Sequence, residues 1–352
     1  MENIRSVDEL KAHLDEMKAE FDGLKKAERK PDDAAVRKAA AYSKAFWEHM
    51  HTGMPENALR EGSDGAGGYL VPDEYEDKLI EGLKEHNILR SLAHTIPTTH
   101  DLRIPVVLSN TTAQWVNESG DYPDTELCFG QTVISAYKVA TSVLVSDELL
   151  EDSGIDLEDY ILKEMSAAIG DAEEEAFFRG NTKAYRKGRG NGSGKPTGLV
   201  SQVSVGAVSA EVGDICIDDV IDLIYSVRKP YREKSVLVMS DDAYFKLHKT
   251  KYANGRYIWN PNYDKDGYET FSGFRVYTTK NLDGIESGNI PVLFGCFDYY
   301  WIGDRGKRVI KRLVERYADH GQVAYISSER VDAKLVHPEA IKGLKIKTPP
   351  NE

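Results

Sequence analysis

The chain has 352 residues, of which 41% are hydrophobic and 29% charged, so it can bury a sizeable core and has the length of about two domains. Its formal net charge of −13 disfavours a protein that wraps nucleic acid on a basic face, because such binding depends on neutralising phosphates. No apolar run reaches the roughly 18 residues of a membrane span, and the charged start MENIRSVDELK argues against a signal peptide, so we expect a cytosolic protein.

The first predicted element is a helix in residues 1–30 with a narrow apolar stripe at alternating steps of three and four. The stripe consists of Val7, Leu10, Leu14, Met17, Phe21 and Leu24. This pattern indicates a short coiled coil with another copy or a partner, and the alternative is an amphipathic helix packed on its own domain. A second helix is expected over residues 33–51, followed by an exposed linker over residues 57–68 that a protease can cut.

Extended segments follow a helix that is predicted over EYEDKLIEGLKEHN, with Asp73 as its N-cap. Residues 102–108 and 131–146 are rich in branched side chains and are predicted to be strands. The polar stretch between them suits a long hairpin arm, which must lie on another surface because an isolated ribbon is marginally stable. Trp115 and Tyr122 would anchor it on a partner, whereas the alternative packs Trp115 on its own domain.

A long helix is predicted over residues 157–179, capped by Asp156 and ended by Gly180. It carries an acidic cluster, and paired carboxylates can act as acid, base or metal ligands. Because neighbouring helical positions point in different directions and no His accompanies them, we expect a solvated face or contacts with basic neighbours instead. The cluster comprises Asp171, Glu173, Glu174 and Glu175.

The glycine-rich stretch KGRGNGSGKPTG, residues 187–198, invites comparison with a phosphate-binding loop. Arg189 stands where the first glycine of that motif belongs, and Pro196 stands where the Ser or Thr belongs. Pro196 also disfavours a helix starting at Lys195. We therefore predict a flexible connection that binds no nucleotide.

The remaining sequence predicts a mixed domain of helices and strands. Helices are expected over IDDVIDLIYSVRK and DDAYFKLHK, the latter capped by Ser240 or Asp241, and strands over SVLVMS, FRVYTT, PVLFGCFDYYWIG and VAYISSERVDAKLVHPEAIKGLKI. A basic cluster is expected to form a solvated face, with a local nucleic-acid patch as the alternative. It comprises Arg305, Lys307, Arg308, Lys311 and Arg312.

No motif of a known catalytic or metal site occurs in the sequence, which lowers the expectation of an enzyme. The nine histidines are scattered, and His248 and His337 are expected to be structural. The three cysteines, Cys128, Cys216 and Cys296, form no Cys-x-x-Cys pair and suit free thiols in a reducing compartment. We expect no cofactor and no metal.

The order of several short motifs resembles the major capsid protein of tailed bacteriophages, the family typified by phage Hong Kong 97. The motifs, in chain order, are GGYLVP at residues 67–72, AQWVNE at 113–118, VSDELLEDS at 145–153, AFFRG at 176–180 and GKPTGL at 194–199. Each is weak alone, and their order and spacing together carry the resemblance. In that family the glycine-rich turn follows a long spine helix and binds no nucleotide.

The resemblance implies an α+β capsid fold with named parts. Residues 1–60 would be a helical scaffold-like delta domain that is often cleaved, and residues 61–97 would be an N-terminal arm and helix. Residues 98–137 would form the E-loop, and residues 138–215 the peripheral domain with its spine helix. Residues 216–325 would form the axial domain, and residues 326–352 would return to the peripheral domain. The implied function is self-assembly into pentamers and hexamers of an icosahedral shell around double-stranded DNA. Implied partners are portal, maturation protease and decoration proteins, and the implied locations are the virion and, during assembly, the host cytoplasm.

We expect the assembly contacts to involve the scaffold helix and the arm. The candidate residues are Leu10, Leu14, Phe21, Trp115, Glu118 and Tyr122. The type member joins subunits covalently through an E-loop lysine and an asparagine of the peripheral domain. No Lys occurs between Arg103 and Tyr137 and no Asn between Ile290 and Pro350, so we predict a shell without such bonds.

Three alternatives remain open from the sequence. An encapsulin-like compartment shares the fold but needs no N-terminal scaffold of about sixty residues, by the same resemblance. A cytosolic enzyme with an unrecognised site would be a monomer or dimer with a bound small molecule. A nucleic-acid-binding module would show strongly salt-dependent binding.

Overall fold

The computed structural model describes residues 41–46, 48, 63–64, 68–70, 73–107, 129–146, 148–149, 157–180, 194–251, 254–259 and 262–349. The chain divides into two units, residues 1–64 and 65–352. In the first unit, residues 41–46 are helical, within the helix predicted over residues 33–51, and Phe46 is buried; strand β1 is Ser63–Asp64. The scaffold candidates Leu10, Leu14 and Phe21 lie outside the described residues.

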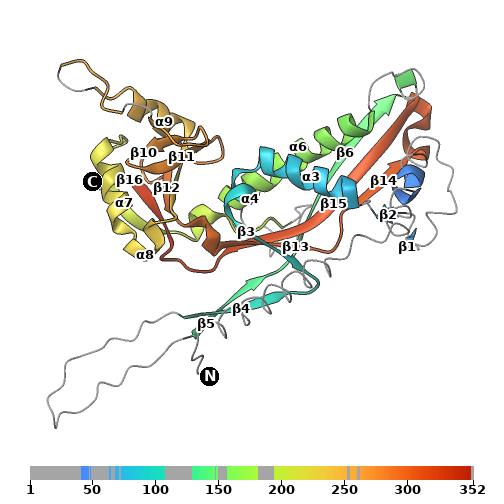
Figure 1. Cartoon of the computed structure of the whole chain (residues 1–352), viewed down its shortest axis with the longest axis horizontal. Coiled ribbons are helices and arrows are strands. Elements are labelled where there is room, and N and C mark those ends of the chain that lie inside the picture. Colours follow the sequence, from blue (N-terminus) through green and yellow to red (C-terminus); the bar gives the residue numbers. More distant parts are fainter. Residues whose placement is uncertain are drawn as a thin grey trace, which may run out of the picture. The chain divides into compact units, whose positions relative to one another are not determined.

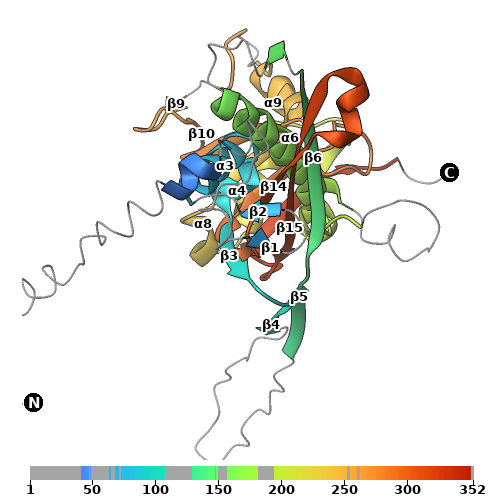
Figure 2. The same ribbon diagram turned by 90° about the vertical axis from the view of Figure 1, so that its right-hand side faces the viewer.

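Two of the predicted helices are confirmed and pack against each other in the second unit. Helix α3, Asp73–His86, begins at Asp73 instead of being capped by it, and the short α4 is Ile88–Leu92. The predicted long helix is α6, Leu157–Arg179. Figures 1 and 2 show α3 lying along α6. A Cβ added at Gly82 would lie 2.8 Å from Ser166 Cβ, so small residues allow this close approach.

The first sheet is built around the long strand β15, Gln322–Leu335. Along one edge of β15 runs β6, Tyr137–Ser146, and along the other run β14, Val309–Leu313, and β13, Tyr300–Arg305. Outside these lie β2, Gly68–Leu70, and β3, His94–Thr98. All pairs are antiparallel except that of β3 with β13.

A separate two-stranded ribbon forms the base of the predicted arm. Strand β4, Leu102–Val107, pairs antiparallel with β5, Phe129–Ile134, in a register that begins with Leu102 opposite Ile134. The predicted strand over residues 131–146 is therefore two strands, β5 and β6. The arm candidates Trp115, Glu118 and Tyr122 lie outside the described residues.

The second sheet has the order β7-β16-β12-β8-β11-β10-β9. Its strands are β7, Ser204–Val212; β8, Val236–Ser240; β9, Asn262–Tyr263; β10, Glu269–Phe271; β11, Phe274–Thr279; β12, Val292–Gly295; and β16, Ile341–Lys347. Helices α7, Ile217–Ser226, α8, Lys229–Arg232, and α9, Asp241–His248, accompany it. The predicted helices α7 and α9 are confirmed, and Ser240 caps α9, its hydroxyl accepting from Ala243 N.

Strand β8 in the middle of the second sheet packs against a core on each of its two faces. Leu237 and Met239 of β8 face a core that includes residues of α7 and α9, whereas Val238 between them faces the other way. That opposite core also contains Phe177 of α6 and Ile302 of β13, so it joins the two sheets. Since successive strand residues point to opposite faces, one strand serves two cores.

The strand pairing places the sheet boundary differently from the expected ranges 216–325 and 326–352. Strands β13 and β14, expected in the axial range, pair with β15 in the first sheet. Strand β16, expected to return to the peripheral part, pairs with β7 and β12 in the second sheet. The physical reason is the hydrophobic alternation of β16, whose Leu344 and Ile346 complete the core under α7.

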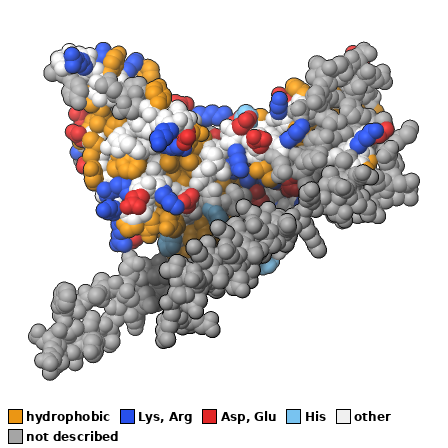
Figure 3. Space-filling model, in the orientation of Figure 1, with side chains coloured by type: hydrophobic (Ala, Val, Ile, Leu, Met, Phe, Trp, Pro, Cys, Tyr) orange, Lys and Arg blue, Asp and Glu red, His pale blue; other side chains and the backbone are white. Residues whose placement is uncertain are grey.

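Short helical turns complete the described chain. The 3₁₀ helices are η3, Leu199–Ser201, η4, Phe297–Tyr299, and η5, Glu315–His320. No helix in the described ranges is long and apolar enough to cross a membrane. Figure 3 shows orange hydrophobic side chains on the surface of the part that carries α9 and β10.

Candidate functional site

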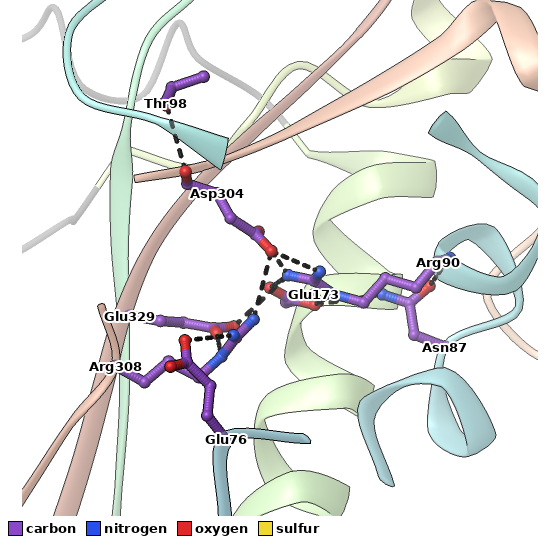
Figure 4. A network of polar contacts seen from close by, with 8 residues as sticks. All are labelled: Glu76, Asn87, Arg90, Thr98, Glu173, Asp304, Arg308 and Glu329. Carbon is purple, nitrogen blue, oxygen red and sulfur yellow. Dashed lines mark hydrogen bonds and ion pairs between the residues drawn. The ribbon is translucent and has the colours of Figure 1, made fainter. Parts of the chain in front are cut away.

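A buried network of charged side chains joins helices α3, α4 and α6 to the first sheet (Figure 4). At its centre Arg90 of α4 makes two bidentate pairs. Its Nε and Nη2 donate to Glu173 of α6 at 2.6 and 2.8 Å, and its Nη1 and Nη2 donate to Asp304 of β13 at 3.0 and 2.9 Å. Paired guanidinium and carboxylate forks are among the strongest polar contacts in proteins.

Local capping geometry sets the position of Arg90. Asn87 precedes α4 in an extended conformation, and its Oδ1 accepts from Arg90 N at 3.2 Å. Its Nδ2 donates to Glu173 Oε2 at 3.4 Å. Because the same side chain caps α4 and contacts α6, the guanidinium starts from a fixed backbone site.

A second arginine, Arg308, extends the network toward β15. Its Nε donates to Glu329 Oε2 at 2.5 Å, and its Nη2 donates to Asp304 Oδ2 at 3.3 Å. Its Nη1 lies 3.7 Å from Glu76 Oε1 on α3. The side chain of Arg308 is only 7% exposed, so the predicted solvated face is wrong at this position. Burial is possible because carboxylates surround the guanidinium.

Burial and neighbouring charges shift the pKa values of the two buried carboxyls in opposite directions. Burial, and then the charge of Glu173, raise the pKa of Glu329 well above its usual range. Burial also acts to raise the pKa of Glu173, but the charge and hydrogen bonds of Arg90 outweigh it, and that pKa is lowered. Glu329 Oε1 is buried and accepts no hydrogen bond, which also favours the neutral form of this carboxyl.

The network thus surrounds two buried guanidinium groups with the buried carboxyls of Glu173 and Glu329 and the partly buried carboxyls of Asp304 and Glu76. Burial by itself would lower the pKa of Arg90, yet Glu173 and Asp304 hold it well above its usual range. Removing one partner would leave an uncompensated buried charge, which is much more costly than losing an exposed ion pair. This arrangement suits a rigid junction, since every charge is bound to another element of the same unit.

The acidic cluster on α6 is thus divided between buried and exposed contacts. Glu173 meets the basic neighbour Arg90, as one of the two expectations had it, but it is not on a solvated face. Glu174 is also buried and accepts from Thr279 Oγ1 at 2.9 Å, and burial raises its pKa. The exposed members are paired with lysines, Asp171 with Lys280 and Glu175 with Lys195.

The described end of the glycine-rich stretch is fastened to the end of α6. Lys195 Nζ donates to Glu175 Oε1 at 2.9 Å, and Gly198 N donates to Gly180 O at 2.8 Å. A Cβ at Gly198 would lie 2.5 Å from Phe178 O, so this position requires glycine. A cavity of about 200 Å³ lies beside it, lined by residues such as Ala172, Ala176 and Val331. The lysine is thus engaged by a carboxylate and the glycine by a helix end.

The base of the arm is held by packing and by one buried carboxyl. Ile104, Val106 and Ile134 of the ribbon pack with Val336 beyond β15. Asp332 Oδ2 accepts from Ser135 N at 2.7 Å, directly after β5. These contacts tie β4 and β5 to β15, while the arm between residues 107 and 129 lies outside the described part.

Other candidate groups have structural partners. His248 Nε2 lies 2.8 Å from Glu269 Oε1 and its ring stacks on Trp259, and His337 meets the edge of Tyr299, in line with the structural roles expected. Cys216 and Cys296 are free thiols. Within the described ranges no group of three or more His, Cys, Asp or Glu side chains is placed to hold a metal.

One known protein family matches this chain over most of its length. The sequence model of the phage capsid family matches residues 67–346. This chain belongs to the phage capsid family. Among curated proteins it is similar to the major capsid protein of Klebsiella oxytoca phage phiKO2, 26% identical over 298 residues that make up 79% of this chain and 68% of that protein.

Solved structures agree on the fold of this family member. The capsid of a native GTA particle matches with a TM-score of 0.59 and 22% identity, over 74% of this chain and 90% of that one. The capsid-family fold also recurs in Gordonia phage Cozz, with a TM-score of 0.53 and 16% identity over 84% of this chain and 92% of that one. The predicted α+β phage capsid fold of Hong Kong 97 type is confirmed.

Sequence reasoning missed the buried network of this family member. Arg90 and Glu173 are 83 positions apart, and Arg90 and Asp304 are 214 apart, so no local spacing relates them. The one available signal was Glu173 itself, which lies on the helix face of Ile169, Ala176 and Phe177, and that face is buried. An acid on an apolar face needs a cation, which predicts a partner without identifying it.

Proposed function

We propose that this chain is a major capsid protein, whose copies assemble into the icosahedral shell that encloses phage double-stranded DNA. The observation that carries the proposal is the family match over residues 67–346 together with the capsid fold. Family membership also supports a structural role in place of an enzymatic one. The charged side chains of the buried network are paired with one another within the subunit, as a structural junction requires.

The shell would be built from pentamers and hexamers, with the arm reaching over a neighbouring subunit. The rigid attachment of β4 and β5 to β15 supports this role, because an arm that bears load needs a fixed base. Its tip would supply Trp115, Glu118 and Tyr122 as contact residues. A two-stranded ribbon is marginally stable in isolation, so contact with a neighbour would also stabilise the arm.

Residues 1–60 would act as a fused scaffold that directs assembly and is then cleaved. Leu10, Leu14 and Phe21 would form its pairing stripe. The shell would mature with the help of a protease and join a portal protein, with decoration proteins as further partners. Assembly would take place in the host cytoplasm.

Electron microscopy of negatively stained full-length protein, beside a truncated chain that begins at Glu61, tests the proposal. We expect rings or shells from the full-length chain, and their loss or distortion without the first sixty residues. Full-length protein that stays a monomer or dimer at every concentration would contradict shell assembly. Intact shells from the truncated chain would contradict only the scaffold role.

The proposed shell would be held without covalent links between subunits. The sequence lacks both the lysine in the arm and the asparagine near the C-terminal strands that the type member uses. Boiled mature particles should therefore run as a single band on a denaturing gel. A ladder of covalent multimers would refute this part of the proposal.

A further inference from the structure

The two outermost strands of the second sheet both expose large apolar side chains. On β7 these are Val205, Val208 and Val212, which are 47%, 55% and 47% exposed. At the opposite end, Tyr263 of β9 is 67% exposed, and Tyr257 just before it is 50% exposed. Grouped apolar side chains on a surface mark contact sites more often than isolated ones do.

The two ends carry opposite charge. Residues 204–226, which form β7 and α7, contain no Lys or Arg and expose Glu211, Asp218 and Asp222, whereas Asp219 is buried and Asp214 is paired with Lys246. Residues 249–263 contain Lys249, Lys251 and Arg256 and no acidic residue. Lys251 Nζ lies 4.7 Å from the centre of the Tyr257 ring, so cation and aromatic surface are presented together. Surfaces of opposite charge steer association and fix its register.

The β7 edge lacks the usual protection of a free strand edge. Natural edges are blunted by lysine, proline or a covering segment, because an open apolar edge pairs with other chains. In SVGAVSAEV there is no lysine and no proline, and in the described part of the chain β7 pairs on one side alone, with β16. Helix α7 packs closely on β7 at Gly206, because a Cβ at that position would lie 2.4 Å from Oγ of Ser226, the last residue of α7. The valines are left uncovered.

The aromatic end has the composition of a contact surface. Tyr and Arg are enriched at the centres of protein interfaces, and Tyr257, Tyr263 and Arg256 all lie here. Figure 3 shows blue cationic and orange hydrophobic side chains beside one another at the end that carries α9. Tyr268 of the same end is 43% exposed with Arg275 stacked 4.6 Å from its ring centre.

We propose that the β7 edge of one copy packs head to tail against the β9 end of a second copy, valines against tyrosines and acids against Lys251 and Arg256. The proposal rests on the proposed shell function and adds the two faces that meet within a ring. Two different faces on one domain give a heterologous contact, which closes into a ring when the rotation between copies allows it. An isologous contact would need only one of the two edges.

Two single variants test this contact in the full-length chain. Val208→Glu adds a negative charge to the acidic edge, and Tyr263→Glu places one where the proposal puts a cationic surface. Both positions are exposed, so both variants should fold with the melting temperature of the wild type. Each should weaken association about tenfold or more, since both lie in the centre of the proposed contact. Val314→Glu, at a valine 42% exposed beyond the first sheet, is the matched control.

Mixing the two variants distinguishes head-to-tail contact from other modes. Val208→Glu retains an intact β9 end, and Tyr263→Glu retains an intact β7 edge. With one variant labelled with ¹⁵N, native mass spectrometry should show mixed dimers that grow no further, and neither variant alone should dimerise.

Homodimers of either variant, or rings at wild-type levels from both, would overturn the head-to-tail contact while leaving the shell function intact. An equal loss with Val314→Glu would show that the effect is not specific to the β7 edge and would also overturn it. Wild-type protein that forms neither rings nor shells would overturn the proposed function first, before the variants are compared.

Discussion

The junction at α6 and the edges of the second sheet use charged residues in opposite ways. At the junction, Arg90 and Arg308 are buried and lie within 4 Å of carboxylates from four other elements. At the edges, Lys251 and Arg256 are exposed, with an apolar surface beside them. The first arrangement is closed within one subunit, and the second leaves groups available to another.

The difference shows that one subunit can keep the groups that fix its fold apart from the groups that are available for contacts with other copies. Buried ion pairs hold a geometry because breaking one leaves a bare charge in a dry site. Exposed charges and apolar side chains contribute little to the fold and are available for contacts between copies. Changes at the junction should therefore act on stability, and changes at the edges on association.

The largest effect on stability is expected from Arg90→Met. The substitution leaves Glu173 and Asp304 without their cation, and the free energy of unfolding of the unassembled subunit should fall by about 3–5 kcal/mol. Denaturant unfolding followed by tryptophan fluorescence measures it. Arg103→Met, at an exposed position on β4, is the control and should change it by less than about 0.5 kcal/mol. Equal losses of unfolding free energy in Arg90→Met and Arg103→Met would contradict the proposed difference between the buried junction and exposed positions.

The same change, Glu to Gln, at two positions of the network compares a carboxyl with a lowered pKa and one with a raised pKa. Glu173→Gln removes the charge that holds Arg90 and should cost about 1.5–3 kcal/mol of unfolding free energy. Burial raises the pKa of Glu329 and so favours its neutral form, which an amide resembles, and Glu329→Gln should cost less than about 1 kcal/mol. Denaturant titration at neutral pH compares them, and a reversed order would contradict the opposite pKa shifts of Glu173 and Glu329.

The pH dependence of folding stability tests the direction of the pKa shift of Glu329. A carboxyl whose pKa is raised by folding stabilises the fold fully below its unfolded pKa, about 4.3 for Glu, and this contribution is lost as pH rises through the folded pKa. Glu329 is such a group. Relative to Glu329→Gln, the wild type should lose stability from about pH 4.3 upward. Parallel curves for the two proteins would show that folding does not raise the pKa of Glu329.

A smaller effect is expected where the glycine-rich stretch meets α6. Gly198→Ala places a Cβ 2.5 Å from Phe178 O and 2.6 Å from Gly180 N, both backbone atoms. The forced shift should cost about 1–3 kcal/mol of unfolding free energy. In the control Gly284→Ala the Cβ meets only the flexible carboxylate of Asp242, at 3.0 Å. Unchanged thermal unfolding of Gly198→Ala would show that this end of the stretch is not fixed to α6.

The smallest effect is expected from Lys280→Ala. Its ammonium lies 3.5 Å from Asp171 Oδ1, and both side chains are at least half exposed. An exposed pair of this kind contributes about 0–1 kcal/mol, so unfolding should shift by no more than that and less at high salt. A loss as large as that from Arg90→Met would remove the distinction between buried and exposed charge.

Local periodicity was enough to predict the helices α3, α6, α7 and α9, but not the short α4 and α8. Residues 157–179 repeat apolar side chains at a helical spacing, and α6 begins and ends at those residues. Strand β3 was missed because Pro97 lies within it, and proline removes a ladder donor. Strand β7 was missed because small residues such as Gly206 and Ser209 interrupt its apolar alternation.

The site could be predicted only in part. A basic neighbour was one of two expectations for the acidic cluster that includes Glu173, but Arg90 was beyond any local pattern. Arg308 was expected on a solvated face because its neighbours in sequence are basic. Its surroundings come from Glu329 across the β14–β15 pair and from Glu76 on α3, which only the fold brings together. Long-range pairing of this kind leaves no periodic trace in the sequence.

Electron cryomicroscopy of particles from cells that make the full-length chain alone tests the central claim most directly. The claim is that copies of this chain build a closed shell from their own contacts. We predict icosahedral particles whose density fits this fold at both five-fold and six-fold positions. Particles that consist only of separate subunits, or of open oligomers without icosahedral symmetry, would contradict the claim.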